Sequence, residues 1–138
     1  MPDKQKPYSV PKNYLFLQDN KKNMHELSIA MQIIEIVKEE AKNHAAIGIS
    51  AINLDIGKLS GIEPDALEFA MEEAVKGSMA EKAEVHYNYI QAVSVCEDCC
   101  REFEVQDYFK TCPFCNSLNT SLIKGKELKI AAIDLITN

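Results

Sequence analysis

Four cysteines in two closely spaced pairs are the residues of this sequence whose types and spacing best support chemistry. Cys96 and Cys99 form one Cys-x2-Cys pair, Cys112 and Cys115 form the other, and 12 residues separate the pairs. Two such hairpins can bring four sulfur atoms to the corners of a tetrahedron, the geometry of a structural zinc site. Because four thiolates leave no open coordination position, the pattern predicts structural rather than catalytic zinc. Two disulfides are the alternative.

The fifth cysteine, Cys100, directly follows Cys99 and could compete with it as a ligand. The two-residue spacing from Cys96 favours Cys99, so Cys100 is expected to be a partly buried small residue. All five cysteines lie between Cys96 and Cys115, which favours a local metal site over a disulfide framework. No secretory signal is recognisable before them, and we therefore expect a cytoplasmic protein, where thiolate–metal bonds persist.

The segment that carries the cysteines, residues 92–125, is too short to be held together by apolar burial alone. Zinc binding worth roughly 10–16 kcal/mol would supply the missing stability. The segment holds five acidic and three basic residues, and four thiolates around zinc add two further negative charges. Without a basic stripe, the sequence predicts no binding to nucleic acid.

Three histidines, His25, His44 and His86, are the other candidate metal ligands. His44 near the end of an expected helix and His86 on the polar side of an expected strand are predicted to be surface residues. His25 lies at an expected helix start, where the helix dipole disfavours imidazolium and keeps the ring neutral and able to bind metal. Taken alone, His25 could equally be solvated, and Glu26 beside it could be a helix cap.

The elements that position these residues follow from hydrophobic periodicity. Apolar residues at spacings of three and four over 27–41 and 67–74 predict two helices, the second with Pro64 in its first turn. Alternation over 52–56 and 85–89 predicts two strands, joined by a right-handed crossover and therefore parallel, and a third strand is expected at about 128–135. The predicted fold class is α+β: a small three-stranded mixed sheet with two helices, plus an inserted zinc-ribbon-like domain with four cysteines.

The chain is predicted to divide into three parts. Residues 1–23 contain three prolines and carry a charge of +3 against −9 for the remainder, so they are expected to be a flexible extension or a start-site artefact. A short apolar patch at 14–17 could dock as a strand or short helix. Residues 24–91 with 126–138 form the predicted α/β domain, and residues 92–125 form the zinc domain. No apolar run approaches the roughly 20 residues of a membrane helix.

Several short motifs together resemble the HypA/HybF family of hydrogenase nickel-incorporation proteins. They are Met24-His25-Glu26-Leu27-Ser28, Ile56-Gly57-Lys58-Leu59-Ser60 followed by Glu63-Pro64, Gly77-Ser78, and the paired cysteine motifs with Cys112-Pro113-x-Cys115. The resemblance covers Met24 to about Leu135. It implies a nickel metallochaperone, not an enzyme, which carries a structural Zn²⁺ and delivers Ni²⁺ as cargo for maturation of NiFe-hydrogenase.

The resemblance also implies a nickel site. His25 would supply its imidazole and backbone nitrogen, Glu26 its backbone nitrogen and carboxylate, and Glu63 would lie near the site. Ni²⁺ accepts such square-planar nitrogen ligation. The backbone amine of Met24 is a ligand only if Met24 is the true N-terminus. Because 23 residues precede it here, either translation starts at Met24 or this protein binds nickel differently.

The partners that the resemblance implies are a GTPase of the HypB type, the NiFe-hydrogenase large subunit and, in some organisms, urease maturation proteins. The sequence is compatible with a homodimer. The alternative function is a protein–protein adaptor whose zinc ribbon docks without tight nickel binding, and nickel affinity that depends on His25 would separate the two. An enzyme is not indicated, because Gly57-Lys58 lacks the earlier glycine and the following Ser/Thr of a phosphate-binding loop.

Overall fold

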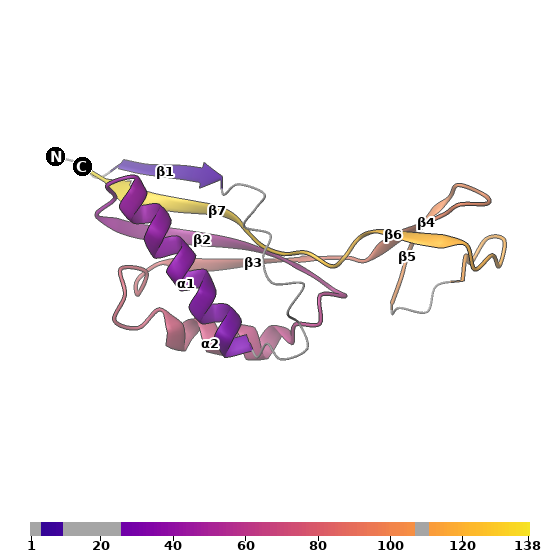
Figure 1. Cartoon of the computed structure of the whole chain (residues 1–138), viewed down its shortest axis with the longest axis horizontal. Helices are drawn as coiled ribbons and strands as arrows, with labels where there is room; N and C mark the ends of the chain where they lie inside the picture. Colours follow the sequence, from indigo (N-terminus) through magenta and orange to yellow (C-terminus); the bar gives the residue numbers. More distant parts are fainter. Residues whose placement is uncertain (1–3, 10–25, 107–110) are drawn as a thin grey trace.

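The computed structural model of the chain describes residues 4–9, 26–106 and 111–138. Figure 1 shows a body that holds the two helices and the longer strands, and a narrower part that holds three short strands. The elements in chain order are β1 (Lys4–Ser9), α1 (Glu26–Asn43), β2 (Gly48–Gly57), α2 (Pro64–Ala74), β3 (Glu84–Ile90), β4 (Val93–Cys96), β5 (Glu102–Glu104), β6 (Thr120–Lys124) and β7 (Leu128–Thr137). In the described ranges, no helix is long and apolar enough to cross a membrane.

The sheet of the body is mixed and has the strand order β1-β7-β2-β3. β2 pairs parallel with β3 and antiparallel with β7, so the three strands expected from alternation pair as predicted. β4, β5 and β6 form a separate three-stranded sheet in the order β5-β4-β6, inserted between β3 and β7. The predicted α+β fold class with an inserted four-cysteine domain is confirmed.

β1 adds a fourth strand to the sheet, which the sequence did not indicate. It pairs antiparallel with β7 from Lys4 opposite Thr137 to Ser9 opposite Ala132. This strand comes from the segment expected to be a flexible extension or a start-site artefact. The apolar patch at 14–17 lies outside the described residues.

The 18-residue helix α1 packs one stripe of its surface into the core. The buried apolar residues recur at spacings of three and four: Ile29, Ala30, Ile33, Ile34, Val37 and Ala41. Leu27, which the periodicity placed on this face, is 51% exposed, as is its i+4 neighbour Met31 at 57%. Both lie on a row beside the stripe, where the core no longer covers them.

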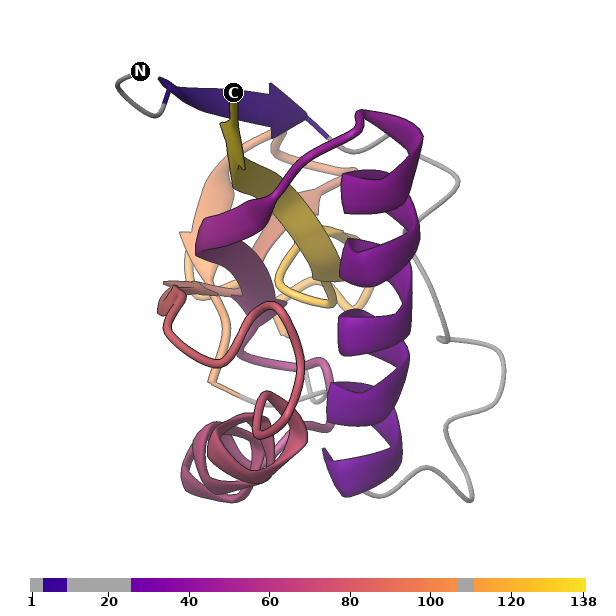
Figure 2. The same cartoon turned by 90° about the vertical axis from the view of Figure 1, so that its left-hand side faces the viewer.

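The helix α2 begins at Pro64, as predicted, because proline at a first helical position has no N–H that needs a partner. Its buried residues Leu67, Ala70 and Met71 join those of α1, β2 and β7 in one core cluster. In the end-on view, α1 runs alongside the sheet and α2 lies across the end of α1 where that helix begins (Figure 2).

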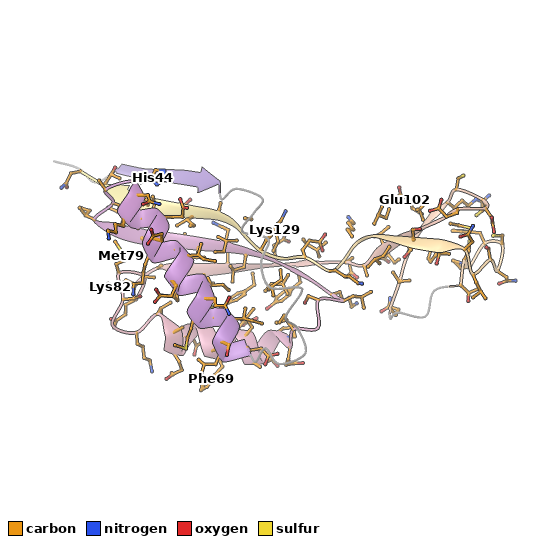
Figure 3. The ribbon with its side chains drawn as sticks, in the orientation of Figure 1. His44, Phe69, Met79, Lys82, Glu102 and Lys129 are labelled. Carbon is orange, nitrogen blue, oxygen red and sulfur yellow. The ribbon has the colours of Figure 1, made fainter. Side chains whose placement is uncertain are left out.

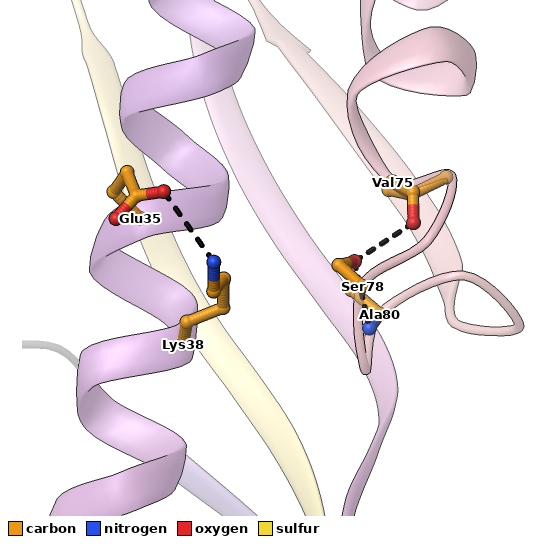
Figure 4. A network of polar contacts seen from close by, with 5 residues as sticks. All are labelled: Glu35, Lys38, Val75, Ser78 and Ala80. Carbon is orange, nitrogen blue, oxygen red and sulfur yellow. Dashed lines mark hydrogen bonds and ion pairs between the residues drawn. The ribbon is translucent and has the colours of Figure 1, made fainter.

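The turn after α2 is closed by the Gly77-Ser78 motif. Gly77 has a φ of +75°, a conformation that glycine adopts without strain. The Ser78 hydroxyl donates to the Val75 carbonyl oxygen (2.8 Å) and accepts from Ala80 N (3.0 Å), as Figure 4 shows beside the Glu35–Lys38 pair of α1. These bonds turn the chain away from α2 and toward β3.

The body and the cysteine part meet at a joint where two glycines touch. A Cβ atom on Gly57 would lie 2.1 Å from the carbonyl oxygen of Gly125, so only glycine allows this approach. Gly57 N donates to the Glu127 carbonyl oxygen (2.6 Å), and Leu59 N donates to that of Gly125 (2.7 Å). The loop that leaves β2 is therefore bonded to the connection between β6 and β7, which returns from the cysteine part.

Leu59 continues this joint into the cysteine part. Its side chain is 7% exposed and packs in a small cluster with Ala92 and Val105, against which Phe103 and Leu122 also pack. A residue of the body thus completes the only apolar cluster found in the described residues of the cysteine part.

Candidate metal centre

The sulfur atoms of Cys96, Cys99, Cys112 and Cys115 all lie within 4.8 Å of one another. The Sγ atoms of Cys96 and Cys115 are 3.6 Å apart, as are those of Cys99 and Cys112. A regular tetrahedron with Zn–S bonds of about 2.3 Å has edges of about 3.8 Å. The four sulfurs therefore fit a tetrahedral ion. The separations of 3.6 Å exceed a disulfide bond length of about 2.05 Å, so the structure contains no disulfide among these four cysteines.

The first hairpin holds its cysteines by backbone hydrogen bonds that close a tight turn. Cys100 N donates to the carbonyl oxygen of Cys96 (2.8 Å), and Cys96 N donates to that of Arg101 (3.0 Å). Cys99 N donates to the Cys96 sulfur (3.4 Å). The turn therefore aims both sulfurs inward and places N–H dipoles against one of them, which favours a thiolate.

The second hairpin repeats the arrangement. Asn116 N donates to the carbonyl oxygen of Cys112 (2.8 Å), Cys112 N donates to that of Ser117 (2.9 Å), and Phe114 N donates to the Cys112 sulfur (3.4 Å). Two segments separated in sequence thus build equivalent halves of one site. This repetition is typical of a closed structural metal centre.

The sulfurs lie so close together that the pKa values of their thiols differ. The Cys99 backbone N–H, as the largest influence, lowers the pKa of Cys96 to about 7. At Cys115, a backbone hydrogen bond from Ser117 lowers the pKa, but the hydrogen bond with the Cys96 thiol, burial and the other two thiols together outweigh it and raise the pKa to about 12. One thiolate therefore opposes the ionisation of the next, and a divalent cation among them would remove this opposition.

Cys100 lies outside the group of four sulfurs and is exposed, so the expectation of a partly buried residue was wrong. Its φ of 65° matches the 64° of Asn116, which occupies the same position after the second pair. Both turns need a left-handed residue there, and asparagine tolerates that conformation better than most. Asn116, directly after Cys115, was therefore the residue in the sequence that signalled a left-handed position after a cysteine pair.

Polar contacts that the cysteine spacing did not predict tie the two hairpins together. The Ser117 hydroxyl and the Asn119 side-chain amide both donate to the carboxylate of Asp98. The guanidinium of Arg101 lies 4.8 Å from the ring centre of Phe114, within cation–π range. These contacts hold the hairpins together at the surface, outside the sulfur cluster.

The acidic residues of the predicted nickel site meet at the starts of the two helices. Glu26 is the first residue of α1, and Glu63 is the residue before α2. Glu63 N donates to Glu26 Oε2 (3.2 Å), although 37 positions separate them. The Glu63 side chain makes no capping hydrogen bond to α2 and is exposed. Met24 and His25 lie outside the described residues.

The two other histidines are surface residues, as predicted. The imidazole Nδ1 of His44 donates to the Glu40 carbonyl oxygen (2.9 Å) at the end of α1. His86 Nε2 lies 3.6 Å from a carboxylate oxygen of Glu84 on β3. Neither belongs to a group of metal-ligating side chains within the part of the chain that the structure describes.

Comparisons with known proteins agree with this arrangement. The HypA family model, described as hydrogenase/urease nickel incorporation, metallochaperone, matches residues 24–135. The hydrogenase maturation factor HypA of Parabacteroides distasonis is 44% identical over 110 residues, which cover 80% of this chain and 96% of that protein. The corresponding factor of Chlorobium luteolum is 42% identical over 110 residues, with 80% and 94% covered.

Solved structures show the same fold. The solution structure of the Ni metallochaperone HypA from Helicobacter pylori superposes with a TM-score of 0.59 at 23% identity, and covers 83% of this chain and 100% of that one. A second HypA solution structure gives a TM-score of 0.63 at 23% identity, with 84% and 99% covered. Residues 1–23 precede the family match. From residue 24 to residue 135, this chain belongs to the HypA family of hydrogenase/urease nickel-incorporation metallochaperones.

Proposed function

We propose that this chain binds one Ni²⁺ as cargo at the start of α1, through His25 and Glu26, and delivers it for the maturation of NiFe-hydrogenase. Membership of a nickel metallochaperone family supports this function. The observation that carries the site is the hydrogen bond from Glu63 N to Glu26 Oε2, at 3.2 Å. It brings the start of α2 beside the residue that follows His25 in the chain.

The chemistry of these groups suits a transferable cation. An imidazole from His25 and backbone nitrogens of His25 and Glu26 can form the planar nitrogen set that Ni²⁺ accepts. The carboxylates of Glu26 and Glu63 supply negative charge at two helix N-termini, where the helix dipoles alone would repel a cation. Because the Glu63 side chain is exposed, a partner could approach the site there and take the ion from it.

The nickel affinity of this proposed site depends on whether the nitrogen of Met24 is a terminal amine. Only a chain that starts at Met24 has a terminal amine there, and the family match begins at this residue. In the 138-residue chain the nitrogen of Met24 is a peptide nitrogen. We therefore propose that the long form binds nickel more weakly than a form that begins at Met24.

We propose that Cys96, Cys99, Cys112 and Cys115 hold a structural Zn²⁺. Their mutual distances of at most 4.8 Å and the paired turns support a tetrahedral ion. Zinc would supply the cross-link between the two hairpins. Because thiolate–metal bonds persist in a reducing compartment, we propose a cytoplasmic location.

The partners proposed from the family are a HypB-type GTPase, the NiFe-hydrogenase large subunit and, in some organisms, urease maturation proteins. The protein would act by binding and transfer and not as an enzyme. The second candidate function is a zinc-ribbon adaptor that docks proteins together without tight nickel binding. The exposed Leu118 and Phe114 of the cysteine part favour this candidate as docking residues.

Native mass spectrometry of zinc-loaded chains 1–138 and 24–138, titrated with nickel, tests the proposal. We expect one tight Ni²⁺ on 24–138, weaker binding on 1–138, and loss of tight binding in 24–138 with His25→Ala. His44→Ala is the matched control, because it removes an imidazole from the opposite end of α1. Equal nickel binding by the His25 and His44 variants would contradict the site. Absence of nickel binding in all chains would favour the adaptor.

A further inference from the structure

β3 forms one outer edge of the body's sheet, and within the described ranges it pairs with β2 alone. Its sequence, Glu84–Ile90, contains neither lysine nor proline, two residues that commonly protect edge strands from accepting another strand, and its one acidic residue, Glu84, is at its first position. The opposite edge strand, β1, contains two lysines and a proline. The sheet therefore has one protected edge and one whose backbone can pair with a further extended segment.

A groove with a volume of about 460 Å³ lies between this edge strand and α2. Met71 of α2, Val75 directly after this helix and Val85 of β3 give it an apolar floor. Side chains of a strand alternate between its two faces, so a segment added to β3 would direct every second side chain toward the α2 side. The groove is thus placed to select the residues of an incoming strand, as grooves beside sheet edges do.

The groove is acidic. Glu68, Glu72 and Glu81 line it together with one lysine, Lys76. The ammonium group of Lys76 is 2.8 Å from the carboxylate of Glu73, so its charge is already compensated. The complementary ligand therefore carries positive charge. A second copy of this chain would present the same carboxylates, and like-charge repulsion opposes pairing of β3 with itself.

Two tyrosines of β3 add a surface for cations beside the carboxylates. The rings of Tyr87 and Tyr89 are stacked, with centres 6.2 Å apart and planes 8° apart. Tyr89 Oη donates to Glu68 Oε2 (2.5 Å) and so ties β3 to α2. Aromatic faces next to carboxylates favour ammonium and guanidinium groups. Lysine and arginine are the side chains that this groove fits.

The edge strand β3 ends near the starts of α1 and α2. A second cavity of about 410 Å³ is lined by Tyr89 and Ile90 of β3 and by Glu63 at the start of α2. Glu63 is the residue bonded to Glu26. Figure 3 shows the labelled Phe69 projecting from α2 away from the sheet, which leaves the β3 side of this helix to the groove.

We propose that the β3–α2 groove is a docking site for an extended segment of a partner protein that carries lysine or arginine at alternate positions. The segment adds to β3 as a strand, and its basic side chains lie among Glu68, Glu72 and Glu81. A partner held in this way has its segment directed toward Glu63. The link to nickel transfer rests on the proposed function, whereas the docking itself does not.

NMR titration of the zinc-loaded 138-residue chain, without nickel, tests the docking. The probe is a blocked seven-residue peptide of alternating lysine and valine. We expect saturable binding in which the amide resonances of Glu84–Ile90 shift most and exchange with solvent more slowly, because edge N–H groups gain partners. A peptide with proline in place of valine keeps the charge but loses backbone donors, and it should not produce these changes.

A pair of charge reversals on the protein provides the matched control. Glu72→Lys, in the groove, should weaken probe binding by roughly tenfold or more, whereas Glu39→Lys, on the exposed side of α1, should change it by less than about twofold. Both variants alter the net charge equally, so a difference in probe binding between them would be an effect of the groove.

Three results would overturn the docking site: no saturable binding, largest shifts in β1, β7 or the cysteine part, or equal binding of the proline peptide. Equal weakening of probe binding by Glu72→Lys and Glu39→Lys would show that only the net charge matters, and this result would also overturn the docking site. Because nickel is absent, failure of the nickel site leaves this result unaffected. Conversely, a chain that binds nickel but not the probe contradicts the docking site alone.

Discussion

At the scale of single residues, the five cysteines have different roles because they occupy different positions in two matching turns. Four sulfurs converge within 4.8 Å, and Cys100 turns away in a left-handed conformation. Spacing alone identified the four, since Cys-x2-Cys is a local geometric unit. The exposure of Cys100 was missed, because it follows from the backbone φ of its turn.

Replacement of one sulfur should remove the metal and the order that depends on it. Cys112→Ala is expected to lose zinc and to disorder the cysteine part, because its apolar cluster is small and metal binding is worth roughly 10–16 kcal/mol. Atomic emission analysis and the NMR dispersion of residues 93–124 measure the two effects.

Cys100→Ala is the matched control for this prediction, because it removes a thiol that lies outside the sulfur cluster. It should retain one zinc per chain. A spectrum of the unmodified protein that is unchanged after addition of a chelator would contradict the structural role of the metal.

At the scale of elements, β3 carries two tyrosines whose surroundings oppose ionisation, and one of them, Tyr89, is bonded to α2. Burial, assisted by the carboxylates of Glu68 and Glu72, raises the pKa of Tyr87 to about 12. Burial also raises the pKa of Tyr89, with the hydrogen bond to Glu68 as the next cause. Alternation predicted the strand, but the groove that it forms with α2 depends on how the helix packs across the sheet.

The pH dependence of stability should report Tyr87. Its pKa is higher in the folded state than the value of about 10 expected in the unfolded chain, so the folded state holds the proton more tightly. Its stabilising effect is complete below about pH 10 and is lost as the pH rises toward 12. Urea unfolding of the Tyr87→Phe variant should show a shallower loss of stability over this window than the parent chain. Parallel profiles would show that Tyr87 is not responsible.

At the scale of the whole molecule, the body and the cysteine part form a joined structure and not two domains on free linkers. The loop after β2 bonds to Gly125 in the connection between β6 and β7, and Leu59 packs into the cysteine part. The same loop leads to Glu63 at the start of α2. The joint therefore connects the part that holds the cysteines with the region of the proposed nickel site.

Substitution at this joint should be costly because two backbones touch there. Gly57→Ala places a Cβ atom 2.1 Å from the Gly125 carbonyl oxygen, so the segments must separate. We expect a loss of at least about 3 kcal/mol in the free energy of unfolding, among the larger effects of single substitutions. Urea unfolding measures the stability, and small-angle X-ray scattering measures the separation of the two parts.

Gly61→Ala provides the comparison, since Gly61 has a φ of +86° but no atom within 4 Å of an added Cβ. Its cost should be limited to the strain of a left-handed backbone, about 1–2 kcal/mol. If the two alanine variants were equally stable, close contact at the joint could not be the reason for glycine at position 57.

The sequence by itself determined the four clustered cysteines, both helices and the three predicted strands of the body, because these depend on spacing within a turn or on periodicity within one element. Tertiary structure decided the contact between Glu26 and Glu63, the approach of Gly57 to Gly125 and the pairing of β1 with β7. Each of these joins residues far apart in the chain. Such contacts depend on strand register and helix packing, which no local pattern specifies.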